Sequence, residues 1–264
     1  MNDSRIQLQP LVFLGHGSPM YALEANRYTA AWADLGKNLT RPAAILVISA
    51  HWLTRGVWAT AMQMPQTIHD FGGFPETLFS LQYSAPGSPQ LAQRVKTLLA
   101  PETEVVLEEN EWGIDHGAWS VLRYLYPAAD VPVVQMSLNG SLDAQGHYDL
   151  ARQLAPLRAE NILILASGNV VHNLRLIHWQ EDATPYPWAL EFNHFFLQAM
   201  QSNQHQALID YESLGEVAHL AIPTPEHYWP ALYPLALQLP GEKVTVITDG
   251  IEMSSISMLS FMIQ

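Results

Sequence analysis

Residues 44–52, AILVISAHW, decide how the fold is interpreted. The segment begins with a short aliphatic run rich in β-branched residues, which is typical of a buried strand. His51 follows the run almost directly. Residues 11–20, LVFLGHGSPM, repeat this arrangement, with His16 just after the apolar run. Both stretches therefore predict a strand that carries a histidine to its carboxyl end.

Similar aliphatic runs recur along the chain, and segments with helical spacing lie between them. The expected strands are residues 11–14, 44–49, 131–136, 161–166 and 243–248, with further candidates at 57–62 and 254–262. The expected helices are residues 22–39, 89–99, 147–157, 188–200 and 226–237, several of them opened by Pro or Ser. The alternation predicts an α/β fold, a three-layer sandwich with a central, mostly parallel or mixed sheet flanked by helices. Without an internal repeat or linker, we expect residues 1–264 to form a single catalytic domain.

Composition excludes several classes of partner. The chain has 264 residues, of which 48% are hydrophobic, and 25 acidic residues against 12 basic ones give a net charge of -13. Such a charge offers no attraction for nucleic acid or anionic membranes. No apolar segment resembles a signal peptide or a membrane span, so we expect a soluble, cytoplasmic protein. Because there is no cysteine, any metal site must use nitrogen and oxygen ligands. The sequence leaves the oligomeric state open.

Eleven histidines remain to be explained. His16, His51 and His172 follow predicted strands, and ligands bind at the carboxyl ends of strands in an open α/β sheet. His116 lies in the irregular segment 108–117, and His227 lies at an expected helix start. Imidazole suits iron, zinc, copper or nickel. One buried histidine alone is more often a hydrogen-bonded core residue, but three at strand ends favour a metal site. Five others, His147, His178, His194, His205 and His219, are expected at the surface or at helix caps.

Seven motifs, in order along the chain, resemble the class III extradiol ring-cleavage dioxygenases, closest to the DOPA 4,5-dioxygenase branch. They are GHGSPM (15–20), SAHW (49–52), IHDFGGFP (68–75), WGIDHG (112–117), ASGNVVHNL (166–174), TPEHY (224–228) and GIEMSSISM (250–258). The likeness runs from about residue 11 to the end of the chain. It is specific for the family and much less so for the substrate.

The resemblance implies one non-haem iron(II) and assigns roles to matched histidines. His16, His51 and His227 correspond to iron ligands. His172 corresponds to the acid–base histidine and to a fourth metal ligand when substrate is absent or zinc is bound. His116 corresponds to a second pocket histidine that steadies bound oxygen or substrate. We expect purified protein to be able to carry Zn(II) in place of Fe(II), because zinc stands higher in the affinity series.

Glu226 offers an alternative ligand, since two histidines and a carboxylate form the usual facial triad of iron oxygenases. Adjacent residues on a helix diverge by about 100°. One member of the pair Glu226 and His227 is therefore expected to face the metal. The resemblance favours His227, and Glu226 is expected to cap the helix or to orient a ligand.

A planar catechol needs aromatic walls, and several aromatic residues lie beside the candidate metal residues. These are Trp52, Phe71, Phe74, Trp119 and Tyr228, each of which is at least as often a core residue as a binding residue. Arg175 or Arg55 is expected to pair with a substrate carboxylate. Asp115 is a weaker candidate for orienting the neighbouring His116 imidazole.

The predicted activity is cleavage of a small catecholic substrate such as DOPA by O2, at the 4,5-bond, to a ring-opened semialdehyde. A zinc-dependent hydrolase could use the same histidines to activate water. A ligand- or peptide-binding module with a vestigial metal site is a further alternative, although binding alone needs no proton-transfer residue beside the ligands. Metal identity and oxygen consumption separate these alternatives.

Overall fold

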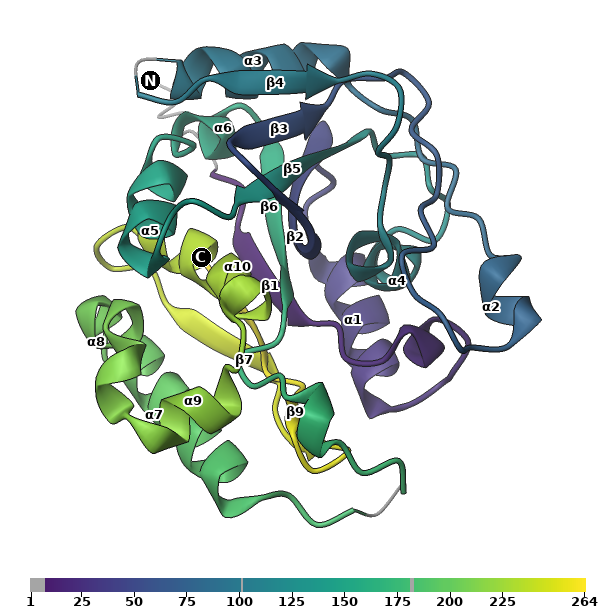
Figure 1. Ribbon diagram of the computed structural model, residues 1–264. Helices are drawn as coiled ribbons and strands as arrows, with labels where there is room; N and C mark the ends of the chain where they lie inside the picture. Colours follow the sequence, from purple (N-terminus) through teal and green to yellow (C-terminus); the bar gives the residue numbers. More distant parts are fainter. Residues whose placement is uncertain (1–7, 101, 181–182) are drawn as a thin grey trace.

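A central sheet of eight strands organises the computed structural model, which describes residues 8–100, 102–180 and 183–264 (Figure 1). The strands are β1 (Leu11–Gly15), β2 (Ala44–Thr54), β3 (Val57–Thr60), β4 (Val105–Glu108), β5 (Val133–Asn139), β6 (Ile162–Gly168), β7 (Val244–Thr248) and β10 (Ser260–Ile263). Their order across the sheet is β4-β3-β5-β2-β6-β1-β10-β7. A separate hairpin contains β8 (Ile251–Glu252) and β9 (Ile256–Ser257).

The sheet is mixed. Strands β5, β2, β6 and β1 are parallel to one another, whereas β10 is antiparallel to both of its neighbours. At the opposite end, β3 is antiparallel to β5 and parallel to β4. The prediction of an α/β fold with a mixed central sheet is therefore confirmed.

Helices cover both faces of the sheet because alternate residues of each strand point to opposite sides. Val12 and Leu14 of β1 pack with α1 (Arg27–Asn38) and α4 (His116–Leu125). Leu11 and Phe13 pack in the core of the other face. The helices on that side are α3 (Pro89–Leu99), α5 (Ala144–Arg152), α6 (Pro156–Ala159), α7 (Pro187–Gln201), α8 (His205–Ile209), α9 (Glu216–Ala221) and α10 (Trp229–Ala236). Two apolar cores on either side of one sheet give the expected three layers.

Several expected helices begin or end elsewhere. The segment 22–39 becomes a 3-10 turn, η1 (Pro19–Ala22), followed by α1, because the Asn26 side chain accepts hydrogen bonds from the first turn of α1 and caps it. The segment 147–157 divides into α5 and α6, and the segment 226–237 divides into η4 (Pro225–His227) and α10. The last expected strand, 254–262, is split between β9 and β10.

The three neighbouring strands β2, β6 and β1 position the site. Because they are parallel, their carboxyl ends meet at one edge of the sheet. The backbone N–H of His16 donates to the carbonyl of Gly168, 3.1 Å away, which joins the ends of β1 and β6. Among the described residues, no helix is both long enough and apolar enough to cross a membrane.

Candidate metal centre and active-site pocket

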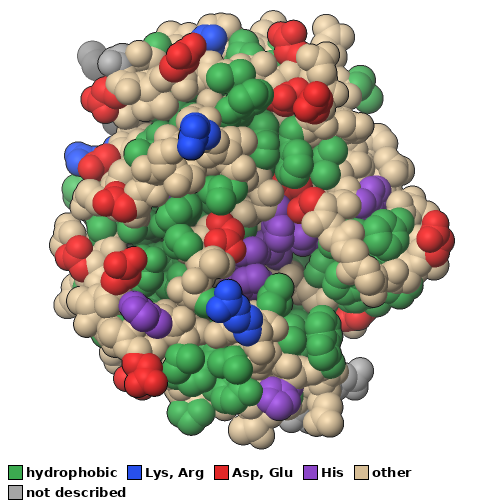
Figure 2. Space-filling view, viewed as in Figure 1, with side chains coloured by type: hydrophobic (Ala, Val, Ile, Leu, Met, Phe, Trp, Pro, Cys, Tyr) green, Lys and Arg blue, Asp and Glu red, His purple; other side chains and the backbone are tan. Residues whose placement is uncertain are grey.

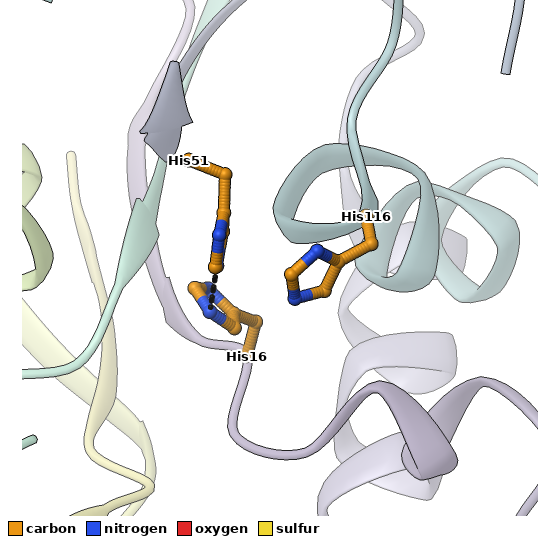
Figure 3. A group of neighbouring side chains, drawn as sticks. All are labelled: His16, His51 and His116. Atoms are coloured by element: carbon orange, nitrogen blue, oxygen red, sulfur yellow. Dashed lines mark hydrogen bonds between the residues drawn. The ribbon is translucent and has the colours of Figure 1, made fainter. Parts of the chain in front are cut away.

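Three histidines from separate elements converge at this edge (Figure 3). His16 directly follows β1, His51 belongs to β2, and His116 is the first residue of α4. The Nε2 atoms of His16 and His51 lie 3.1 Å apart and face one another. One nitrogen from each of the three rings lies within 4.8 Å of the others.

Ser167 determines which nitrogen of His16 carries its proton. The Ser167 hydroxyl donates to the carbonyl of Gly117 at 2.6 Å, so its oxygen is left to accept. The Nδ1 atom of His16 lies 3.0 Å from that oxygen and must donate to it. The neutral His16 ring therefore presents a lone pair at Nε2, the atom that faces His51.

Asp70 determines which nitrogen of His51 carries the proton. Its Oδ2 atom lies 3.2 Å from Nδ1 of His51, and its Oδ1 atom lies 3.0 Å from Nδ1 of His116. Burial raises the pKa of the Asp70 carboxyl, but the His116 and His51 imidazoles outweigh burial and lower the pKa below its ordinary value. An ionised carboxylate beside Nδ1 keeps the proton there, so His51 also directs a lone pair from Nε2.

Two lone pairs that face each other across 3.1 Å, one on the buried His16 and one on the partly buried His51, repel unless a cation lies between or beside them. Burial, followed by the neighbouring His51 and His116, lowers the pKa of His16 well below 6.5, so the His16 ring is neutral at neutral pH. The donor set therefore fits a metal ion better than it fits a proton.

His227 supplies a further unused nitrogen. It ends η4 and is buried, with its Nδ1 atom 3.3 Å from Oε1 of Glu226. Its Nε2 atom is buried and has no hydrogen-bond partner among the described residues. The His227 ring centre lies 5.5 Å from that of His16 and 4.9 Å from that of His51, and the His16 and His51 centres are 5.0 Å apart. Imidazoles that share one ion through Nε2 at about 2.1 Å have ring centres roughly 4.5–5.5 Å apart.

His172 and His116 flank this group. The His172 ring stacks on His227 with ring centres 3.5 Å apart and an interplanar angle of 8°. Burial, with the nearby His51 and His116, lowers the pKa of His172 to about 3. Burial, with the nearby His51, lowers the pKa of His116 to about 4. Both rings are therefore neutral near pH 7, the state in which an imidazole can bind a metal or accept a proton.

The histidines form the floor of a pocket of about 800 Å³. Figure 2 shows histidine side chains inside a hollow that is bordered by hydrophobic side chains. The walls include Met20, Phe71, Phe74, Ile177, Trp179 and Met253. Phe71 meets the His116 ring edge-to-face, with centres 5.3 Å apart. A second hollow of about 910 Å³, beside Asp143 and Tyr211, has no histidine in its lining, so we assign the chemistry to the histidine pocket.

Two of the expected substrate residues do not line this pocket. Trp52 is buried and stacks on Trp112, with ring centres 5.8 Å apart, because successive residues of β2 point to opposite faces. Tyr228 is fully buried, and its hydroxyl donates to the carbonyl of Leu208 at 2.7 Å. Both therefore act as core residues in this structure.

The other expected binding residues, except Arg55, lie at or near the pocket. Phe74 lines it directly. Arg175 is exposed and lies in η2 (Leu174–Leu176), next to the pocket residue Leu174. Trp119 is buried behind Phe71, with ring centres 6.2 Å apart. Arg55 is exposed in the turn between β2 and β3 and does not line the pocket.

Sequence reasoning missed Asp70 and Ser167, the two residues that orient the imidazoles. Asp70 belongs to the motif IHDFGGFP, so its place inside a matched motif was the available signal. Asp115, the candidate orienting residue, has other partners. Its carboxylate accepts from Ser49 Oγ at 2.7 Å and from the backbone N–H of Ala118, so it caps α4. Burial raises the pKa of Asp115 to about 6.

A family model, described as the catalytic LigB subunit of aromatic ring-opening dioxygenase, matches residues 10–260. The chain belongs to this family. Among curated LigB-like relatives, an Escherichia coli K12 protein named 4,5-DOPA dioxygenase extradiol is 51% identical, over 96% of this chain and 94% of its own. A Beta vulgaris protein of the same name is 37% identical, over 86% of each chain.

A solved structure has the same fold. The crystal structure of an uncharacterized protein from Escherichia coli K12 matches this LigB-family chain with a TM-score of 0.85 and 47% identity, over 97% of this chain and 100% of that one. The family match and the named relatives confirm the resemblance to the extradiol dioxygenases. This LigB-family chain is a ring-cleaving dioxygenase.

Proposed function

We propose that this protein is an iron(II)-dependent extradiol dioxygenase that cleaves catechols such as DOPA at the 4,5-bond. The observation that carries the proposal is the pair of Nε2 lone pairs, from His16 and His51, that face one another at the floor of an apolar pocket. In the proposed reaction one ring carbon–carbon bond beside the paired hydroxyls breaks. Both atoms of O2 enter the ring-opened semialdehyde.

His16, His51 and His227 would hold the metal. Their three ring-centre distances suit one shared ion, whereas His116 lies 3.8 Å from His51 between ring centres, which is too close for two ligands of one ion. The Nδ1 atom of His116 also faces the Asp70 carboxylate. Iron(II), when bound, supplies the redox chemistry that lets a catechol react with O2. The same nitrogen atoms could bind Zn(II), but zinc has no redox chemistry.

The protein residues would bind the ring and move its protons. Phe71 and Phe74 meet at right angles, with ring centres 5.5 Å apart, and provide apolar surface for the catechol ring. His172 is neutral and partly exposed to the pocket, so it can accept a catechol proton and later return it to a product oxygen. Arg175, beside the pocket mouth, is our candidate for binding a substrate carboxylate.

Metal reconstitution tests the proposal. Metal-free protein loaded with Fe(II) should consume O2 and produce a coloured semialdehyde from DOPA-like catechols. Protein loaded with Zn(II) should bind the ion and produce no colour. Measurement of O2 uptake and product absorbance across a small catechol panel distinguishes the two. Equal turnover with zinc, or turnover without O2 consumption, would favour a hydrolase.

A further inference from the structure

One carboxylate lies between two imidazoles of different proposed function. Each oxygen of Asp70 faces the Nδ1 atom of a different ring, with 3.2 Å to His51 and 3.0 Å to His116. The Oδ1 atom also accepts the backbone N–H of His116 at 3.0 Å. The Nδ1 atom of His116 is close to Oδ1 of Asp70 but lacks the geometry of a hydrogen bond, yet two lone pairs at this separation would repel. A proton on Nδ1 removes that repulsion.

We propose that Asp70 is a positioning residue that holds both His51 and His116 as the Nδ1–H tautomer and so points both Nε2 lone pairs into the pocket. The inference rests on the proposed metal site at His51. It adds that His116 faces the substrate as a hydrogen-bond acceptor. An acceptor suits a catechol hydroxyl better than it suits an oxygen molecule, which has no proton to donate.

The backbone around Asp70 is fixed well enough for this role. The N–H of Ile68 donates to the carbonyl of Ile114 at 2.8 Å, and the indole N–H of Trp119 donates to the carbonyl of Ile68 at 2.8 Å. These bonds join the loop that carries Asp70 to the segment that leads into α4. The next residue, Phe71, forms part of the pocket wall. Asp70 therefore connects the proposed metal ligand, the second histidine and the aromatic wall.

Replacement of Asp70 by Asn is a sharp test, because an amide has about the same shape but a single acceptor oxygen. In the variant one of the two Nδ1–H groups loses its acceptor and meets an amide N–H₂ instead. We expect Asp70→Asn to weaken Zn(II) affinity by roughly 10- to 100-fold, the usual effect of losing a partner of a metal-bound histidine. Competition with a chromogenic chelator measures this without any catalytic turnover.

The matched control is Glu76→Gln, which removes an exposed carboxylate from α2 (Glu76–Phe79), at the end of the same loop. This variant should bind Zn(II) as the wild type does. Thermal unfolding of both metal-free variants shows whether they fold. A folded Asp70→Asn protein with wild-type Zn(II) affinity, in which His51 and His116 both remain protonated at Nδ1, would overturn the proposal.

The wild-type protein provides a second test that does not depend on a variant folding. Long-range ¹H–¹⁵N spectra of the Zn(II)-loaded, ¹⁵N-labelled protein report which ring nitrogen of each histidine carries hydrogen. We expect His51 and His116 both to be protonated at Nδ1, with Nε2 metal-bound in His51 and free in His116. A His116 ring protonated at Nε2 would contradict the proposal. Failure of the dioxygenase assay would leave these two readouts unchanged.

Discussion

At the scale of a single residue, His172 allows metal binding to be distinguished from proton transfer. Its ring stacks on the buried His227 ring, and the backbone N–H of His172 donates to the carbonyl of Ala221 at 2.9 Å. These contacts place the imidazole beside the proposed ion without requiring it to be a ligand.

Replacement of His172 by Ala should therefore leave most iron binding intact and lower kcat by roughly 10²- to 10⁴-fold, the scale expected for loss of one general acid–base group. His16→Ala should instead lose the metal, because it removes one of the two facing lone pairs. Metal content after gel filtration and kcat at saturating catechol test both. If the His172 variant is as metal-free as the His16 variant, His172 is an obligatory ligand.

The sequence predicted which histidines lie close together, but it did not predict which residues orient their imidazole rings. The sequence indicates His16, His51 and His172 because each follows a predicted strand, and the order of parallel strands brings strand ends together. The orienting contacts of Asp70 and Ser167 join segments far apart in the chain, and no local pattern encodes such contacts. Trp52 was expected in the pocket because it adjoins His51 in sequence, although adjacent strand residues face opposite ways.

At the scale of elements, the end of β6 lies tightly against η4. A Cβ atom at Gly168 would lie 2.2 Å from the carbonyl oxygen of His227, and the same oxygen accepts the N–H of Asn169 at 2.9 Å. A side chain at position 168 would push η4, and with it the His227 imidazole, away from the other histidines.

We expect Gly168→Ala to lower the free energy of unfolding by roughly 1–3 kcal/mol, a typical cost of overpacking, and to weaken metal binding. Gly140→Ala is the control, since a Cβ there would make ordinary contacts of 3.4 Å with Leu53. Urea unfolding and chelator competition measure the two effects. A Gly168→Ala protein with wild-type metal affinity would show that η4 can shift without moving His227.

Strands and helices could be predicted where the hydrophobic pattern in the sequence was long and uninterrupted. The aliphatic runs at β1 and β6 became strands close to their expected bounds, because a buried parallel strand needs a continuous apolar run. Strand β2 continues to Thr54, beyond its expected end at residue 49, and so includes His51. The segment 226–237 was expected as one helix. It divides because η4 ends at His227, and Pro230 lies in the first turn of the next helix, α10. This division leaves His227 in a tight 3-10 turn, which periodicity alone does not reveal.

At the scale of the whole molecule, the cluster of neutral histidines makes the metal-free protein sensitive to acid. Folding lowers the pKa of His116 to about 4 and of His172 to about 3, in both cases chiefly through burial, from an ordinary value of 6.5. His16 and His227 shift in the same direction. As the pH falls below about 6.5, histidines of the unfolded chain bind protons, whereas the same histidines of the folded chain stay neutral. The free energy of unfolding therefore decreases as the pH falls toward the folded-state pKa values.

Between about pH 7.5 and pH 5.5 we expect the free energy of unfolding of metal-free protein to fall by on the order of 2–4 kcal/mol. Asp115 opposes part of this loss, because burial raises the pKa of its carboxyl to about 6 and the folded state then binds its proton more tightly. Urea denaturation in the presence of EDTA at the two pH values measures the change. Stability that stays constant or rises on acidification would show that the histidines do not remain neutral.

The proposed ligands lie far apart along the chain. His16 follows the first strand, and His227 lies beyond α9, so a bound ion would close a loop that contains most of the fold. Such a cross-link disfavours the unfolded chain, and its contribution grows with the concentration of free metal. Iron supply would then set the lifetime of this protein in the cell as well as its activity. Chains made during iron scarcity would open more often and be degraded sooner than chains made when iron is plentiful.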